Sequence, residues 1–224
     1  MRTPQAPAPE RFRILAVSDE VSDSLYGGPL NQLVGQIDLV LGCGDLPADY
    51  LEFLVSMLNV PLYYVFGNHD ASGWWRANGT LTLEPQGCFP LEGRTANFRN
   101  ILLAGLGGSI RYAPVARNQF TQREMWSKTL ALAPRLWFNR LRYGRFLDIF
   151  VSHSPPQGIQ DGPDAAHVGF EAFRWLLRWA QPRWHLHGHT TPVRNRPTPR
   201  SKFESTEVIF VPPYQLLEWK TGND

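Results

Sequence analysis

Several features that mark whole classes of protein are missing from this chain of 224 residues. No apolar run approaches the roughly 20 residues that a membrane-spanning helix requires. The net charge is only +2, so a nucleic-acid partner stays possible but has no support from the composition. No glycine-rich stretch has the spacing of a nucleotide-binding P-loop. What is present is a hydrophobic fraction of 43%, which is typical of a globular protein.

Cysteine is also scarce. Cys43 and Cys88 are the only two, and they provide no disulfide framework. They suit a reducing compartment, so we expect a cytoplasmic protein. Residues 1–10 are rich in Pro and Ala and contain no apolar segment, which argues against a secretory signal and predicts a flexible N-terminal arm. Residues 11–224 are long enough for a single domain with a substantial core.

Five apolar runs that we predict to be strands each end in a side chain able to bind a metal. The central one is the aromatic run 61–66, which leads into Gly67-Asn68-His69-Asp70. Open α/β sheets place ligands at the carboxyl ends of their strands. Loop composition is not normally restricted to carboxylates, amides and imidazoles, so the repetition favours a metal site over five unrelated turns. The other four runs lead into Asp19, Asp45, His153 and His189.

In this order the motifs resemble the calcineurin-like metallophosphoesterase superfamily. Its pattern is Asp-x-His, Gly-Asp, Gly-Asn-His-Asp/Glu, a lone His and Gly-His-x-His, and the resemblance extends from Asp19 to about Thr191. The segment 152–156, Ser-His-Ser-Pro-Pro, also looks like the fourth block of small bacterial members. The alternation of strands and helices indicates an α/β protein. The resemblance implies more, namely a four-layer α/β/β/α sandwich of two mixed sheets flanked by helices.

The resemblance implies one complete metal site. Its ligands would be Asp45, Asn68, His153 and His189, a mixed oxygen and nitrogen set that suits a divalent transition metal. We expect Mn²⁺ first, with Fe²⁺, Zn²⁺ or Ni²⁺ as alternatives.

Two departures from the family pattern fall on the other metal position. The first block reads Asp19-Glu20-Val21, and Thr191 stands where the last block has its second His. Asp19 and the shared Asp45 would then be the only family ligands left there, so we expect this position to be weakly filled or empty. Glu20 or Asp23 can supplement it, or they can belong to a solvated loop or a helix cap.

For the chemistry, the resemblance implies hydrolysis of a phosphodiester or a small phosphomonoester by metal-activated water. His69 would act as the general acid, with Asp70 orienting its ring. Asn68, Arg111 and His167 are candidate substrate contacts, although a surface salt bridge explains Arg111 equally well. The alternative is a non-catalytic binding or scaffold protein on the same fold, resembling the retromer scaffold subunit, which the two departures favour.

Other segments predict the remaining elements. We expect a strand hairpin over 88–97 and 100–106, and a helix that begins at His167 and ends at 180. Two helices are expected over 121–131 and 134–141, and Thr121 with Glu124 resembles a capping box. The segment 121–145 is rich in aromatic residues and arginine. It can form a surface for lipid or a partner, or helices packed beside the active site with their arginines extended into solvent.

Overall fold

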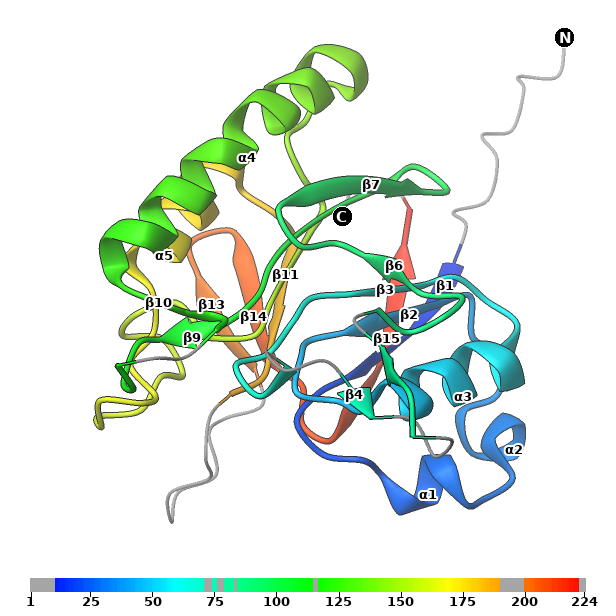
Figure 1. The fold of residues 1–224 in the computed structure, drawn as a ribbon. Helices are drawn as coiled ribbons and strands as arrows, with labels where there is room; N and C mark the ends of the chain where they lie inside the picture. The colour runs from blue at the N-terminus through cyan, green and yellow to red at the C-terminus, as the bar shows by residue number, and fades with distance from the viewer. Residues whose placement is uncertain are drawn as a thin grey trace, which may run out of the picture.

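The computed structural model describes residues 11–70, 74–75, 79–82, 84–114, 117–189 and 200–221 (Figure 1). The predicted arm, residues 1–10, lies outside these ranges. The chain forms two large mixed sheets, and parallel strands alternate with helices along most of it. There are also two short two-stranded sheets. In one, β9 (Ser109–Ile110) pairs with β10 (Gln119–Phe120), and in the other β4 (Trp74–Trp75) pairs with β5 (Leu81–Thr82).

The first sheet has five strands. Its three central strands are parallel, so their carboxyl ends point to the same edge. The last strand of the chain pairs antiparallel with the first and closes one side of the sheet. In spatial order the strands are β15 (Tyr214–Lys220), β1 (Arg11–Val17), β2 (Leu39–Gly42), β3 (Leu62–Tyr64) and β6 (Phe89–Pro90).

The second sheet has six strands, of which the four central ones are parallel. Both edge strands run antiparallel to their neighbours. Strands β8, β11 and β12 of this group are buried along their whole length. Burial on both faces explains the continuous apolar runs of β8 and β11, whereas β12 carries two buried histidines. In spatial order the strands are β13 (Arg200–Phe203), β14 (Thr206–Phe210), β12 (Trp184–His187), β11 (Ile149–Ser152), β8 (Ile101–Leu106) and β7 (Arg94–Phe98).

Three apolar layers hold the sheets and helices together, and they confirm the predicted four-layer sandwich. A central layer, which includes Ile14, Leu41, Leu103 and Ile149, contains side chains from both sheets. The outer layers lie between each sheet and its helices, which flank the molecule on opposite sides in Figure 1. The helices α1 (Asp23–Tyr26), α2 (Leu30–Val34) and α3 (Ala48–Leu58) cover the first sheet, and α4 (Gln122–Tyr143) and α5 (Glu171–Ala180) cover the second.

The predicted hairpin is correct in its second half and wrong in its first. Strands β7 and β8 pair as expected, but residues 88–97 do not form one strand. Phe89 and Pro90 instead join β3 in the first sheet. Gly93, with φ of 62°, lies in the turn between β6 and β7. A left-handed residue breaks an extended run, and the chain uses this turn to pass from one sheet to the other.

The break predicted before Pro134 is also wrong, because α4 is one continuous helix. Proline removes the hydrogen bond that its N–H would donate to the carbonyl of residue 130. Leu130 and Pro134 both lie on the exposed side of the helix, where water can satisfy that carbonyl. On the opposite side, Leu132 and Leu136 are fully buried against the second sheet. This packing keeps the helix intact across the proline.

The helix predicted from His167 begins four residues later, at Glu171. Gly169 packs closely against the backbone of residues 155–157, and Phe170 is extended and bridges to Pro156. The segment before α5 is therefore fixed as a loop, and His167 does not stand at a helix N-terminus.

The capping box at the start of α4 is confirmed, and it generates a stability prediction. Thr121 Oγ1 accepts a hydrogen bond from the Glu124 amide at 3.2 Å, and the Glu124 carboxylate accepts from the Thr121 amide at 2.7 Å.

Thr121→Ala should lower the free energy of unfolding by about 1 kcal/mol, since the amide of Glu124 loses its hydrogen-bond acceptor. Urea denaturation would measure this loss. Ser127→Ala, in the same helix and also exposed, is the control and should change stability little; equal losses in both variants would contradict the capping role.

Candidate metal centre

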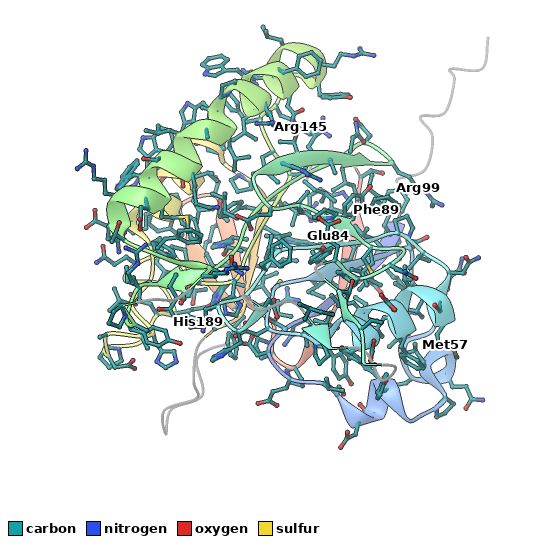
Figure 2. The ribbon with its side chains drawn as sticks, in the orientation of Figure 1. Met57, Glu84, Phe89, Arg99, Arg145 and His189 are labelled. Atoms are coloured by element: carbon teal, nitrogen blue, oxygen red, sulfur yellow. The ribbon has the colours of Figure 1, made fainter. Side chains whose placement is uncertain are left out.

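Side chains from both sheets meet where the carboxyl ends of their parallel strands face each other. Asp19, Asp45 and Asn68 follow β1, β2 and β3 of the first sheet. His153 and His189 follow β11 and β12 of the second sheet, and His189 is labelled in Figure 2 at the end of the described chain before residue 200. The structure thus places all five residues after strands, as the sequence predicts.

Three of the five form a compact group of potential metal ligands. One ligand atom each from Asp45, His153 and His189 lies within 4.8 Å of the others, and two of these residues are buried. The Nε2 atom of His153 is 3.2 Å from Asp45 Oδ2 and 3.0 Å from Asn68 Oδ1. Asn68 therefore presents its amide oxygen to the same space, and all four predicted ligands of the complete site lie together.

Hydrogen bonds at the far side of each imidazole fix which nitrogen is available. His153 Nδ1 lies 2.8 Å from the carbonyl of Cys43, and His189 Nε2 lies 2.8 Å from the carbonyl of Ala166. A nitrogen facing a carbonyl must carry the proton, so His189 offers Nδ1 as a lone-pair donor. His153 Nε2 faces the oxygens of Asp45 and Asn68 and is protonated there, so it would become a ligand on giving up that proton. A carbonyl at the far nitrogen is the pattern of metal-binding histidines, whose second nitrogen is held by an acceptor. The donor set fits a divalent transition metal.

Burial and neighbouring charges shift the pKa values of the candidate ligands in different directions. Burial lowers the pKa of both imidazoles, but the Asp45 and Asp19 carboxylates outweigh it at His153 and raise its pKa to about 9. At His189 burial prevails, reinforced by His153, and the pKa falls to about 3. Burial would raise the pKa of Asp45, yet the adjacent His153 lowers it overall. The carboxylate thus stays ionised and draws positive charge into a buried space.

The backbone of the site is strained at three of the candidate ligands. Asp19, Asp45 and His189 have φ of 62°, 56° and 60°, the left-handed region that such residues seldom adopt. Strain of this kind persists only where the surroundings enforce it, and it gathers at functional sites. Here the enforcement is close packing: a Cβ at Gly188 would overlap Ser18 and Asp19, and one at Gly67 would overlap Asp45. The Gly in Gly67-Asn68 and in Gly188-His189 is required for that reason.

Asp19 is held by hydrogen bonds from its neighbours. Its carboxylate accepts a hydrogen bond from Ser18 Oγ at 2.5 Å and from the His189 amide at 3.0 and 3.1 Å. It does not belong to the compact group of ligands within the described residues. Asp19 therefore ties the exit of β1 to the loop that carries His189. Burial raises the pKa of this carboxyl.

The residues around the expected second metal position provide few additional ligands. Val21 packs against the apolar layer under α1–α3. Glu20 is exposed, and Asp23 is the first residue of α1, which agrees with the solvated loop and helix start that the sequence left open. Thr191 lies outside the described residues.

His69 and Asp70 do not form the pair expected from the sequence. The His69 side chain is 75% exposed, and its Nε2 lies 4.0 Å from Asp45 Oδ2. The Asp70 carboxylate is buried, and its Oδ2 accepts from the Gly67 amide at 2.7 Å and the Asp45 amide at 3.0 Å. Burial raises the pKa of Asp70 to about 6. Asp70 thus joins the loops after β2 and β3. It does not hold the His69 ring in the way that the sequence led us to expect.

The two other candidate substrate contacts are both paired with carboxylates. Arg111 meets both oxygens of Glu124 at 2.9 Å, as in the salt bridge that the sequence left open, and the pair lines an open hollow of about 630 Å³. His167 Nδ1 lies 2.8 Å from Asp164, and its ring centroid is 5.2 Å from that of His189. His167 is therefore next to the candidate metal group, while Arg111 lines a hollow that contains none of its three residues.

Sequence reasoning missed two residues that contact the central motif. Tyr112 Oη accepts a hydrogen bond from Asn68 Nδ2 at 3.1 Å, which turns the amide oxygen of Asn68 towards His153. Asn118 Nδ2 donates to the carbonyl of Gly67 at 3.2 Å. Both residues come from the segment between β9 and β10. This segment has neither a motif nor a clear periodicity, so no signal in the sequence marks them.

Comparisons with known proteins bear on the fold and the family. A search of the curated proteins gave no match. Among solved structures, the protein TT1561 of Thermus thermophilus aligns with a TM-score of 0.59 and 18% identity over 90% of this chain and 89% of its own. A second crystal structure, which carries no protein name, aligns with a TM-score of 0.62 and 14% identity over 93% and 95% of the two chains. At these identities the likeness concerns the fold alone.

The sequence comparison with protein families covers most of the chain. The model of the family described as calcineurin-like phosphoesterase matches residues 13–192, a range that begins in β1 and contains every predicted site residue. The match agrees with the four-layer sandwich and with the group of Asp45, His153 and His189 at its strand ends. The chain belongs to the calcineurin-like phosphoesterase family.

Proposed function

We propose that this protein is a metal-dependent phosphoesterase that hydrolyses a phosphodiester or a small phosphomonoester. The observation that carries the proposal is the compact group of Asp45, His153 and His189, with the Asn68 amide oxygen beside it. A purely structural cluster would not need two imidazoles from one sheet directed at a carboxylate and an amide oxygen from the other. Membership of the family supports the reaction class.

These four residues would hold the ion, and Mn²⁺, Fe²⁺, Zn²⁺ and Ni²⁺ all suit their donor atoms. When bound, such an ion supplies a more acidic water and neutralises charge on phosphate oxygens. The chain itself keeps Asp45 ionised and orients the two imidazoles through the carbonyls of Cys43 and Ala166. A cation bound here would replace the proton between His153 Nε2 and the oxygens of Asp45 and Asn68.

His69 is the proposed general acid. Its amide donates to Asp45 Oδ1 at 2.8 Å, which fixes the backbone, while its ring extends into solvent beside the ligands. From there it can give a proton to a leaving alkoxide. His167 lies on the other side of His189 and can contact the substrate phosphate. Arg111 would have to leave Glu124 to do so.

A non-catalytic scaffold is the second candidate, because Val21 is packed into the core and the Asp19 carboxylate is engaged by its neighbours. Elemental analysis of the purified protein separates the two. Phosphoesterase function requires about one tightly held ion per chain and hydrolysis of chromogenic mono- or diesters with Mn²⁺, Fe²⁺, Zn²⁺ or Ni²⁺. Asp45→Ala should lose both the ion and the activity. No metal above trace level after Mn²⁺ addition, together with no hydrolysis, would establish the scaffold.

The proposal places the protein in the cytoplasm and treats residues 11–224 as one domain. Cys43 and Cys88 are both free, which supports a reducing compartment. The apolar layer shared by the two sheets supports a single domain. The described residues include no helix long and apolar enough to cross a membrane.

His69→Ala should leave the ion bound and lower turnover by roughly two to four orders of magnitude, as expected for a lost general acid. The loss should be much smaller for nitrophenyl esters than for alkyl esters, because a nitrophenolate leaves without a proton. Steady-state rates for matched ester pairs, with metal content measured in parallel, test this. An equal loss for both esters would show that His69 only positions the substrate.

The degenerate metal position yields a gain-of-function prediction. Val21→His with Thr191→His should raise metal stoichiometry from near one towards two per chain and increase diesterase activity, because imidazoles bind these ions far better than valine or threonine. Each single change should do much less, since both ligands would serve one ion. Val21→Ala with Thr191→Ala is the control without new ligands. A native chain that already holds two tight ions would refute the assignment.

A further inference from the structure

The second half of α4 has an apolar stripe that faces solvent. Leu130, Pro134, Phe138 and Leu141 follow one another at intervals of four, four and three residues, which places them on one side of a helix. Leu130 is 51% exposed, Phe138 64% and Leu141 83%. In Figure 1 this end of α4 extends beyond the sheet that its other half covers. The stripe is exposed where the helix leaves the body of the protein.

The core of the protein does not account for this stripe. The inner side of α4 buries its own set of side chains, including Met125, Leu132 and Leu136, and so already anchors the helix. Between the two faces, Trp137 is 51% exposed and packs edge-on against Phe146 at 5.1 Å. The helix is therefore apolar on two opposite sides, one facing the sheet and one facing solvent.

The charge around the stripe has one sign. From Met125 to Leu147 the sequence contains no Asp or Glu and five basic residues. Lys128 pairs with Glu92, and Arg145, labelled in Figure 2 near this end of α4, pairs with Asp148. The remaining three, Arg135, Arg140 and Arg142, are exposed and form no ion pair with the described residues.

These three arginines lie on both sides of the stripe. With 3.6 residues per turn, Arg135 and Arg142 project on one side of the line through Phe138 and Leu141, and Arg140 projects on the other. Arg140 also packs its guanidinium over Phe146 at 5.7 Å, close to Trp137. The surface thus has apolar side chains at its centre and cations at its edges.

We propose that this outer face of α4, formed by Leu130, Pro134, Phe138 and Leu141 with Arg135, Arg140 and Arg142, binds the surface of an anionic lipid bilayer. Phe, Leu and Trp side chains enter the boundary between headgroups and acyl chains, and arginines pair with lipid phosphates. The protein would lie on the membrane, and this attachment is independent of the proposed phosphoesterase activity.

A second copy of the chain is a poorer occupant. A two-fold contact through the stripe would bring the same patch of each copy together. The arginines of one copy would then face those of the other with no carboxylate on this face to separate them, because the segment has none. Like charges brought together in this way oppose association, whereas an anionic bilayer satisfies both the apolar and the cationic groups.

Sedimentation of the full-length protein with vesicles tests the proposal. Vesicles of phosphatidylcholine with about one third phosphatidylglycerol should bind at least tenfold more tightly than pure phosphatidylcholine, and raising the salt to about 0.5 M should weaken binding. Phe138→Ser with Leu141→Ser should lower the affinity at least tenfold. Arg135→Gln with Arg142→Gln should lower it by roughly fivefold for each arginine replaced.

Matched controls lie away from α4. Met57, 47% exposed on α3 at the far side of the molecule in Figure 2, and Arg11, exposed on β1, should tolerate Met57→Ser and Arg11→Gln without loss of vesicle binding. Circular dichroism and esterase rates without lipid should be unchanged in every variant. Three outcomes would overturn the proposal: no binding to either vesicle, equal binding to both, or a concentration-dependent dimer that the double serine variant abolishes without any vesicle binding.

Discussion

The arrangement of the candidate metal centre depends on the carboxylate of Asp45. One of its oxygens accepts the His69 amide, and the other lies beside the His153 imidazole from the opposite sheet. Its own amide donates to Asp70, which also holds the Gly67 amide. A single residue thus joins the exits of β2 and β3 to the exit of β11. These contacts fix the loops on both sheets together.

The chain uses its carboxylates in two ways, and their types alone do not reveal which. Asp45 faces two imidazoles and can bind an ion, whereas Asp19 and Asp70 are occupied by backbone amides and a hydroxyl. An ionised carboxylate oxygen can accept a hydrogen bond from a backbone amide as readily as it can bind a cation. A motif that resembles a metal-binding motif can therefore serve to hold loops together. This distinction matters most at Asp19, where the neighbouring imidazoles of the family pattern are replaced by Val21 and Thr191. Asp19 can be retained after the two imidazoles are lost, because its carboxylate still holds neighbouring loops by hydrogen bonds.

Local sequence features predicted much of the fold and most of the site. Apolar runs ending in Gly and a polar residue located the strand exits. The family resemblance implied the set of Asp45, Asn68, His153 and His189, which the structure brings together; that they bind a metal stays a prediction. The errors came from contacts distant in sequence. Residues 88–97 divide between two sheets, α4 continues through Pro134 because its inner face packs, and α5 starts late because Gly169 lies against another loop. Tyr112 and Asn118 reach the site only through the folded position of their loop.

The division of the ligands between the two sheets has a thermodynamic consequence. Asp45 and Asn68 belong to the first sheet, and His153 and His189 belong to the second, so one ion would cross-link the two halves of the sandwich. Binding to the folded state alone adds about 2.7 kcal/mol to its stability when the free ion is at a hundredfold its dissociation constant. The concentration of a trace metal would then set how firmly the sheets are docked. The free energy of unfolding would therefore rise with the concentration of the free ion.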